Sequence, residues 1–208
     1  MFVTGPGLLF VVSGPSGAGK DTLVDGLLRG SSGLKYSVSS TTRVPREGER
    51  EGEDYFFLAR DVFEEGMRSG EFLETREYNG NLYGTPRGFI KDTLAHGYDV
   101  IAKPEVNGAL SIKASFPDAV LIFILPDKFA HLRRRLEARR TETNEEIAAR
   151  LAIAHEEIKS MRSFDYLVIN ADEQHEAAIA DLRAILRAEK LRIHRYNDGR
   201  IQAIVTEP

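Results

Sequence analysis

A glycine-rich segment followed by a lysine is the part of this sequence whose residue types and spacing most directly imply chemistry. Glycines let a backbone wrap so that several N–H groups point at one polyphosphate, and the start of a following helix adds partial positive charge. The lysine would reach the β- and γ-phosphates and offset charge during a transfer. The segment matches the G-x-x-x-x-G-K pattern and so predicts a phosphate loop for a nucleoside triphosphate. Its residues are Gly14, Pro15, Ser16, Gly17, Ala18, Gly19 and Lys20.

The position after the lysine departs from this pattern. The pattern has Ser or Thr there as a magnesium ligand, whereas this sequence has Asp21 followed by Thr22. A carboxylate beside a triphosphate repels it unless a metal ion or another cation lies between them. Asp21 is therefore predicted either to lie on the metal side or to pair with a nearby positive group. Asp21 and Thr22 are the candidate protein ligands of a Mg²⁺ ion.

A second cluster combines hydroxyl groups, arginines and phenols. The run Ser37–Arg46 contains several Ser and Thr residues together with Arg43 and Arg46, and the aromatic segment Tyr55–Phe57 follows it. Two arginines, a hydroxyl and phenols can saturate a monophosphate dianion with charge-assisted hydrogen bonds. On residue type alone the two arginines could also be solvated surface charges. The surrounding hydroxyl groups favour the phosphate site.

The elements that would position these residues alternate between buried strands and amphipathic helices. The apolar run 8–12 ends directly before the glycine-rich segment, and a helix follows that segment. Strands alternating with helices form βαβ units, so the prediction is an α/β fold with a parallel sheet flanked by helices, of the phosphate-loop NTPase type. The further strands are expected at 100–102, 120–125 and 166–169, and the further helices around 106–114, 128–139, 145–161 and 174–189.

The segment from Tyr36 to Tyr83 has short aromatic and β-branched runs between polar turns, which predicts a small mixed sheet inserted into the larger domain. Thr85 and Pro86 are expected to be the N-cap and first residue of the next helix. Alternation around Asn197-Asp198-Gly199 predicts a β-hairpin that could cap the fold or join two copies in a homodimer. The predicted division is a core at 7–35 and 86–188, an insert at 36–85, a helical lid at about 133–150, and a C-terminal extension at 189–208.

The overall composition limits the class of protein. A length of 208 residues with 42% hydrophobic and 29% charged residues suits one soluble α/β domain with inserts. The absence of cysteine excludes disulfides and thiolate chemistry. A net charge of −4 argues against sequence-independent nucleic-acid binding. No apolar run is long enough for a membrane span and no signal peptide is visible, so a cytoplasmic protein without a membrane partner is expected.

In their order and spacing, the motifs between about Leu8 and about Leu186 resemble those of guanylate kinases. The resemblance implies ATP as phosphoryl donor, GMP as acceptor and Mg²⁺ bound with ATP. It further implies that the GMP phosphate is held by a serine, two arginines and two tyrosines, which are Ser39, Arg43, Arg46, Tyr55 and Tyr83.

The same resemblance assigns base recognition to Glu74 and Thr85. Guanine presents donors at N1 and at the 2-amino group, which a carboxylate can accept together, and Thr85 can donate to O6. Adenine has an acceptor at N1, so Glu74 would face a lone pair. Sites built on such pairs reject the wrong partner by on the order of 10⁴–10⁵.

On the donor side, the resemblance identifies the arginine-rich stretch from 133 to 150 as a lid. Arg139 and Arg150 would close over the ATP phosphates, and Lys20, Arg43, Arg139 and Arg150 would share the developing charge as the catalytic set. Asn170, directly after a predicted strand, falls where the family contacts the adenine of ATP.

One segment breaks the family pattern. Where family members have an Asp-x-Asp-x-Gln-Gly-like run, this sequence has Lys103-Pro104-Glu105-Val106-Asn107-Gly108. Glu105 keeps a carboxylate that could serve the acceptor, but the first acid is replaced by Lys103. Since Asp21 is an added acid and both positions frame the phosphate site, we hypothesise a charge swap. Either Asp21 pairs with Lys103, or Asp21 takes over the metal-side role while Lys103 meets a phosphate.

Two other functions remain open from the sequence. A related kinase acting on ribose 1,5-bisphosphate is favoured slightly by the Asp after the loop lysine, whereas Glu74 and Thr85 favour GMP because a sugar phosphate needs no pair that reads a base. A non-catalytic guanylate-kinase-like binding module is disfavoured by Lys20 and the lid arginines.

Overall fold

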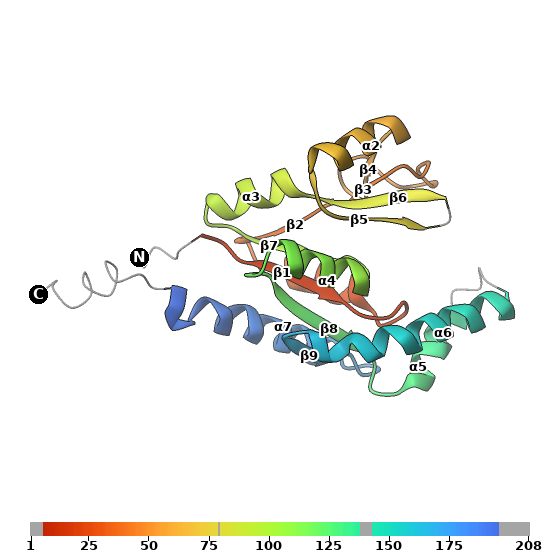
Figure 1. Ribbon diagram of the computed structural model, residues 1–208. Helices are drawn as coiled ribbons and strands as arrows, with labels where there is room; N and C mark the ends of the chain where they lie inside the picture. Colours follow the sequence, from red (N-terminus) through yellow and green to blue (C-terminus); the bar gives the residue numbers. More distant parts are fainter. Residues whose placement is uncertain (1–5, 79, 138–142, 196–208) are drawn as a thin grey trace, which may run out of the picture.

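The computed structural model describes residues 6–78, 80–137 and 143–195 (Figure 1). The larger of its two sheets is parallel throughout. The strand that leads into the glycine-rich segment lies in the middle of this sheet, so the segment emerges at the centre of its carboxyl edge. In spatial order the strands are β2 (Leu34–Tyr36), β7 (Asp99–Ala102), β1 (Leu9–Ser13), β8 (Val120–Leu125) and β9 (Tyr166–Ile169).

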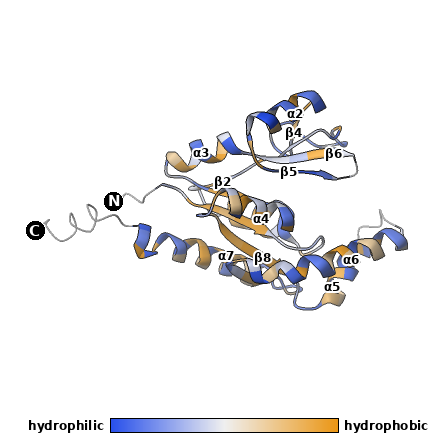
Figure 2. Ribbon diagram, viewed as in Figure 1, coloured by the Kyte–Doolittle hydropathy of each residue, from blue (hydrophilic) through white to orange (hydrophobic). Residues whose placement is uncertain are grey.

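Alternate residues of β1 pack into two cores on opposite faces of the sheet. Phe10 and Val12 pack against helices α1 (Lys20–Leu28) and α7 (His175–Lys190). The intervening residues, Leu9 and Val11, pack against helices α3 (Arg87–Ala95) and α4 (Val106–Ser115). All four β1 side chains are fully buried, which stabilises the fold by about 2 kcal/mol for each. Figure 2 shows the strands of this sheet in the colours of hydrophobic residues.

A smaller, mixed sheet lies on one side of the core (Figure 1). Its strands β3 and β4 are parallel, and its other pairings are antiparallel. Helix α2 (Arg60–Ser69) covers it, with the ring of Phe63 stacked on Phe72 at 4.4 Å between centroids. The strands in spatial order are β4 (Phe56–Phe57), β3 (Ser40–Thr41), β6 (Asn81–Pro86) and β5 (Phe72–Tyr78).

Helices α5 (Phe129–Glu137) and α6 (Asn144–Lys159) extend from the core beside the end of β1, on the other side from the small sheet (Figure 1). The start of α6 is fixed by a capping box. The Thr143 hydroxyl accepts from the Glu146 N–H at 3.3 Å, and the Glu146 carboxylate accepts from the Thr143 N–H at 2.7 Å. Two short 3₁₀ turns, η1 (Ser160–Ser163) and η2 (Ile193–Arg195), complete the described chain.

The predicted fold class is confirmed, and the strands and helices of the core lie within two residues of their predicted ends wherever the structure describes them. No element was predicted where the structure has β2, which adds an edge strand to the core sheet, or where it has α2. The predicted N-cap at Thr85 is wrong, because β6 continues to Pro86 and the Thr85 hydroxyl bonds to Glu74 instead. In the C-terminal extension, 193–195 form a 3₁₀ turn instead of a strand, and the rest of the predicted hairpin lies outside the described residues. None of the helices described is long and apolar enough to cross a bilayer.

Candidate active site

The phosphate loop joins β1 to α1, and two of its glycines are required by close packing. Gly14 has φ of 138°, and a Cβ there would lie 2.2 Å from the carbonyl oxygen of Ile124. Gly19, the N-cap of α1, has φ of 86°, and a Cβ would lie 2.3 Å from the Asn170 carboxamide nitrogen. Any larger residue would push the loop away from β8 or from Asn170, so the backbone could not keep this course.

Lys20 begins α1 and reaches back across the loop. Its ammonium donates to the carbonyl oxygens of Gly14 at 2.5 Å and Pro15 at 3.0 Å. Arg150 on α6 donates to the Ser16 hydroxyl of the same loop at 3.4 Å. The structure therefore brings two of the four residues in the predicted catalytic set to the phosphate loop. Arg139 lies outside the described residues.

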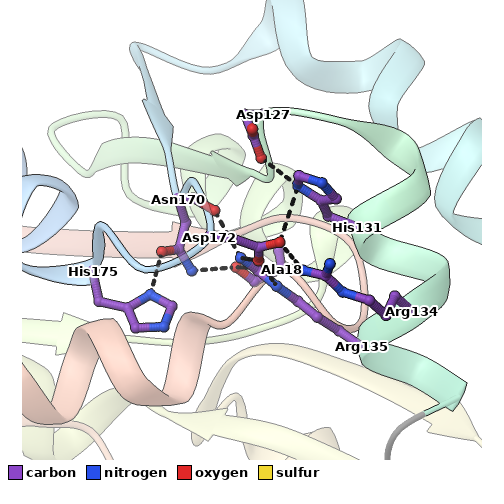
Figure 3. A network of polar contacts seen from close by, with 8 residues as sticks. All are labelled: Ala18, Asp127, His131, Arg134, Arg135, Asn170, Asp172 and His175. Atoms are coloured by element: carbon purple, nitrogen blue, oxygen red, sulfur yellow. Dashed lines mark hydrogen bonds and ion pairs between the residues drawn. The ribbon is translucent and has the colours of Figure 1, made fainter.

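A network of polar side chains contacts the phosphate loop at the carbonyl oxygen of Ala18 (Figure 3). Asn170, fully buried after β9, donates to the carbonyl oxygen of Ala18 at 2.8 Å and contacts the His175 ring nitrogen at 2.7 Å. Arg135 donates to the Asn170 carbonyl at 3.0 Å and to the Asp172 carboxylate at 2.8 Å. With both ends of its carboxamide engaged, Asn170 supports the loop, and the geometry does not favour the adenine contact expected of its side chain.

A cavity of about 470 Å³ connects the phosphate loop with the small sheet. It brings together half of the predicted site residues, from segments far apart in the chain. Its lining includes predicted residues from the loop, the small sheet, the end of β7 and α6: Gly14, Ser16, Lys20, Asp21, Ser39, Tyr55, Glu74, Tyr83, Glu105 and Arg150. The predicted residues outside that lining are Thr22, Arg43, Arg46, Thr85 and Asn170, and the loop residues Pro15, Gly17, Ala18 and Gly19.

Glu74 and Thr85 form a hydrogen-bonded pair at the small-sheet end of this cavity. The Thr85 hydroxyl, which is 1% exposed, donates to the Glu74 carboxylate at 2.7 Å. Burial raises the pKa of Glu74, and the Thr85 bond and the charge of Arg76 oppose that rise. The pair is therefore a desolvated acceptor held in one orientation, which is what discrimination between base edges requires.

Arg43 and Arg46 differ in their placement. Arg43 is largely buried, donates to the Glu49 carboxylate at 2.8 Å, and lies over the Tyr55 ring at 5.5 Å. The hydrogen bond with Glu49 raises the pKa of Arg43. Arg46 is exposed, and its backbone N–H donates to the same carboxylate at 2.7 Å. Glu49 was not predicted, and an incoming phosphate would have to share Arg43 with it.

The structure contains the predicted ion pair between Lys103 and Asp21. Burial and then the nearby charge of Lys20 lower the pKa of Lys103 to about 8. An adjacent carboxylate favours the charged form of an amine, so the ammonium is protonated at neutral pH. A second ion pair joins Glu105 to Arg76.

Arg76 and Glu157 line the cavity but were not predicted. Arg76 lies over the Tyr83 ring at 5.1 Å. Side chains two residues apart on a strand point to the same face. Since Glu74 was predicted to lie in the site, the sequence could have predicted that Arg76 lies there too. Glu157 lies two turns beyond Arg150 on α6 and carried no such signal.

Glu157 provides a prediction about stability and pH. Burial raises its pKa from 4.5 to about 7, so the folded state binds a proton that the unfolded state releases between these two values. Its stabilising effect is complete below about pH 4.5 and is lost as the pH rises through 7. We expect Glu157→Gln to raise the free energy of unfolding at pH 8 by about 1–2 kcal/mol, less than a fully buried group would give because the side chain is partly exposed.

Denaturant unfolding of both proteins at pH 5 and pH 8 measures this effect. Glu156→Gln is the matched control, because Glu156 is exposed and pairs with Lys159 at 2.7 Å. An equal stability difference at the two pH values would contradict the assignment to Glu157.

A parallel sheet with a phosphate loop, a small inserted sheet and a helix whose arginine reaches the loop define a nucleoside monophosphate kinase. The sequence profile described as guanylate kinase matches residues 7–189. The chain belongs to the guanylate kinase family.

Individual relatives agree over nearly the whole length. A guanylate kinase of Symbiobacterium thermophilum is 43% identical over 199 residues, which cover 96% of this chain and 93% of that protein. One of Thiobacillus denitrificans is 46% identical, covering 91% and 90%. The crystal structure of guanylate kinase from Anaplasma phagocytophilum superposes with a TM-score of 0.79 at 30% identity, covering 99% of this chain and 98% of that one.

Proposed function

We propose that this protein transfers the γ-phosphoryl group of ATP to GMP, giving ADP and GDP. The observation that carries the proposal is one cavity lined both by phosphate-loop residues and by Glu74, whose carboxylate is oriented from behind by Thr85. ATP phosphates would bind the loop, and guanine would bind Glu74. The acceptor phosphate would then lie between them, beside Ser39, Tyr55 and Tyr83. Thr85 donates its one hydroxyl proton to Glu74 and lies outside the cavity, so it would orient Glu74 and would not donate to O6 as expected from the sequence.

The transfer proceeds in line, without a covalent enzyme intermediate. A phosphate dianion is already a nucleophile, so no general base is required, and the protein contributes positioning and charge. Lys20 and Arg150 act at the phosphate loop, and Arg43 acts from the acceptor side. Arg139 completes the proposed set from the lid. Closure of the lid would exclude water and so suppress ATP hydrolysis.

Kinases of this kind generally use a metal ion with ATP, and we propose Mg²⁺. Hydroxyl and carboxylate oxygens are the donors that Mg²⁺ prefers, which fits Thr22 and Asp21 in the first turn of α1. Asp21 is held by Lys103 through one oxygen, Oδ1. Within the described residues no group of three or more His, Asp or Glu side chains could hold a metal. Mg²⁺ at such sites is bound largely by substrate phosphates and water, and it would neutralise charge on the β- and γ-phosphates.

The proposal is tested by following the phosphorus resonances of a mixture of ATP, GMP, Mg²⁺ and the protein. We expect the GMP signal to be replaced by the two signals of GDP, in step with the appearance of ADP. Release of inorganic phosphate without GDP would show a nucleoside triphosphatase and would contradict the proposal.

A further inference from the structure

Lys103 occupies the carboxyl end of β7, between the strands that lead to the two halves of the site. The sheet order is β2, β7, β1, so β7 separates the strand before the phosphate loop from the strand that leads to Ser39. Its end is anchored to the loop strand, because the buried Ser13 hydroxyl donates to the carbonyl oxygen of Pro104 at 2.9 Å. The backbone that carries Lys103 is therefore fixed relative to the phosphate loop.

The side chain of Lys103 points into the cavity that joins the two halves. It is 24% exposed, lies over the Tyr36 ring at 5.9 Å, and contributes to the lining together with Lys20 and Tyr83. An ammonium group has three donors. Asp21 is its ion-pair and hydrogen-bond partner among the described residues and accepts one of them.

Phosphoryl transfer requires two anionic groups to meet near this position. The γ-phosphate of the donor and the phosphate of the acceptor must approach within bonding distance, although both are anionic. Lys20 lies on the donor side and is occupied along the loop. A second ammonium at the junction would offset the repulsion where the two groups meet, in a cavity where charge is screened less than in water.

We propose that Lys103 is a catalytic residue that donates to phosphate oxygens at the junction of donor and acceptor, and that Asp21 positions it. This inference rests on the proposed phosphoryl transfer to GMP. The Asp21–Lys103 pair then has a defined function: Asp21 directs the ammonium group from the first turn of α1 while leaving its other two donors for the substrates.

The test compares Lys103→Met with Lys103→Arg and with a control, Lys35→Met. Lys35 is an exposed lysine on the neighbouring strand β2, and it lies over Tyr98 outside the cavity. We expect Lys103→Met to lower kcat by about 10²-fold, as removal of a single charge-stabilising donor does. Lys103→Arg, which keeps the charge, should recover at least about one tenth of the wild-type rate. The control should match the wild type.

Binding supplies a second measurement that does not depend on turnover. The first probe is a dinucleotide in which adenosine and guanosine are joined by five phosphates, and it should occupy both the donor and the acceptor half of the site. The second probe is guanosine, which has no phosphate and should occupy only the part of the site that binds guanine. Lys103→Met should weaken the pentaphosphate by about 10-fold or more, as expected for a lost charge-assisted contact, and should leave guanosine unchanged. Equal affinity of Lys103→Met and Lys35→Met for the pentaphosphate would overturn the proposal, as would equal losses of kcat in Lys103→Met and Lys103→Arg.

The positioning role of Asp21 is tested by a double-mutant cycle. Asp21→Asn should lower kcat by at least about fivefold more in the wild type than in Lys103→Met, because the positioning effect of Asp21 requires the lysine, whereas its effect on Mg²⁺ binding is present in both. Additive effects would overturn the positioning role. The two proposals fail in different experiments. If the wild type does not turn over GMP, the proposed function is wrong. If Lys103→Met binds the pentaphosphate as tightly as Lys35→Met does, the role of Lys103 is wrong, whatever the turnover.

Discussion

Replacing Lys20 by methionine is expected to lower turnover by at least about 10³-fold while the protein stays folded. Methionine keeps the length and apolar stem of lysine but removes the ammonium group. In the structure this group donates to two loop carbonyls, Gly14 and Pro15, and so lies where the β- and γ-phosphates would enter. The charge that develops in the transferred group would lose its closest fixed cation on the donor side.

The measurement is the rate of ADP formation with saturating ATP and GMP, together with thermal unfolding. Lys35→Met is again the control for the loss of one lysine elsewhere on the protein. Residual activity of Lys20→Met within about tenfold of the control, with an intact fold, would refute the role of Lys20.

Replacing Glu74 by glutamine is expected to reduce the preference for GMP over AMP by at least about 10³-fold. The half-buried carboxylate can accept from both guanine donors, whereas a carboxamide presents one acceptor and one donor. Thr85 fixes the orientation of Glu74 by a 2.7 Å hydrogen bond, so the change alters the chemistry of the contact without moving it. Most of the effect should fall on kcat/KM for GMP.

The control for this prediction is Glu77→Gln on the same strand. Glu77 is exposed and lies 3.8 Å from Arg60 on the surface, so it should leave base preference unchanged. The ratio of kcat/KM for GMP and AMP is measured for all three proteins. An unchanged ratio in Glu74→Gln would show that the base is read elsewhere.

The core of the fold was predictable because its signals are local. Apolar runs such as 8–12 and 120–125 are too apolar for a surface and too short for a membrane, and the phosphate loop marks its own strand and helix. The exception is β2, whose three residues, Leu34–Tyr36, have one exposed lysine and little periodicity. It is a strand because β7 supplies its hydrogen-bond partners, which no local pattern shows.

The site was predictable in the placement of Lys20 at the phosphate loop, from the motif, and in that of Arg150, from the family resemblance. It was less predictable where a role depends on a distant partner. Asn170 is engaged by Ala18 and His175, Thr85 by Glu74, and Arg43 by Glu49. The Asp21–Lys103 pair lies between these two cases. Two departures from the family pattern, of opposite charge and 82 positions apart, were hypothesised to pair, and the structure pairs Asp21 in the first turn of α1 with Lys103 directly after β7.

The central claim, that GMP is the acceptor, is tested most directly by offering different acceptors with ATP and Mg²⁺ and measuring ADP release. GMP, AMP and ribose 1,5-bisphosphate are supplied separately. We predict fast turnover with GMP alone. Turnover with ribose 1,5-bisphosphate in place of GMP would assign the protein to the sugar-phosphate kinases instead, and a lack of turnover with any of the three would contradict a catalytic role altogether.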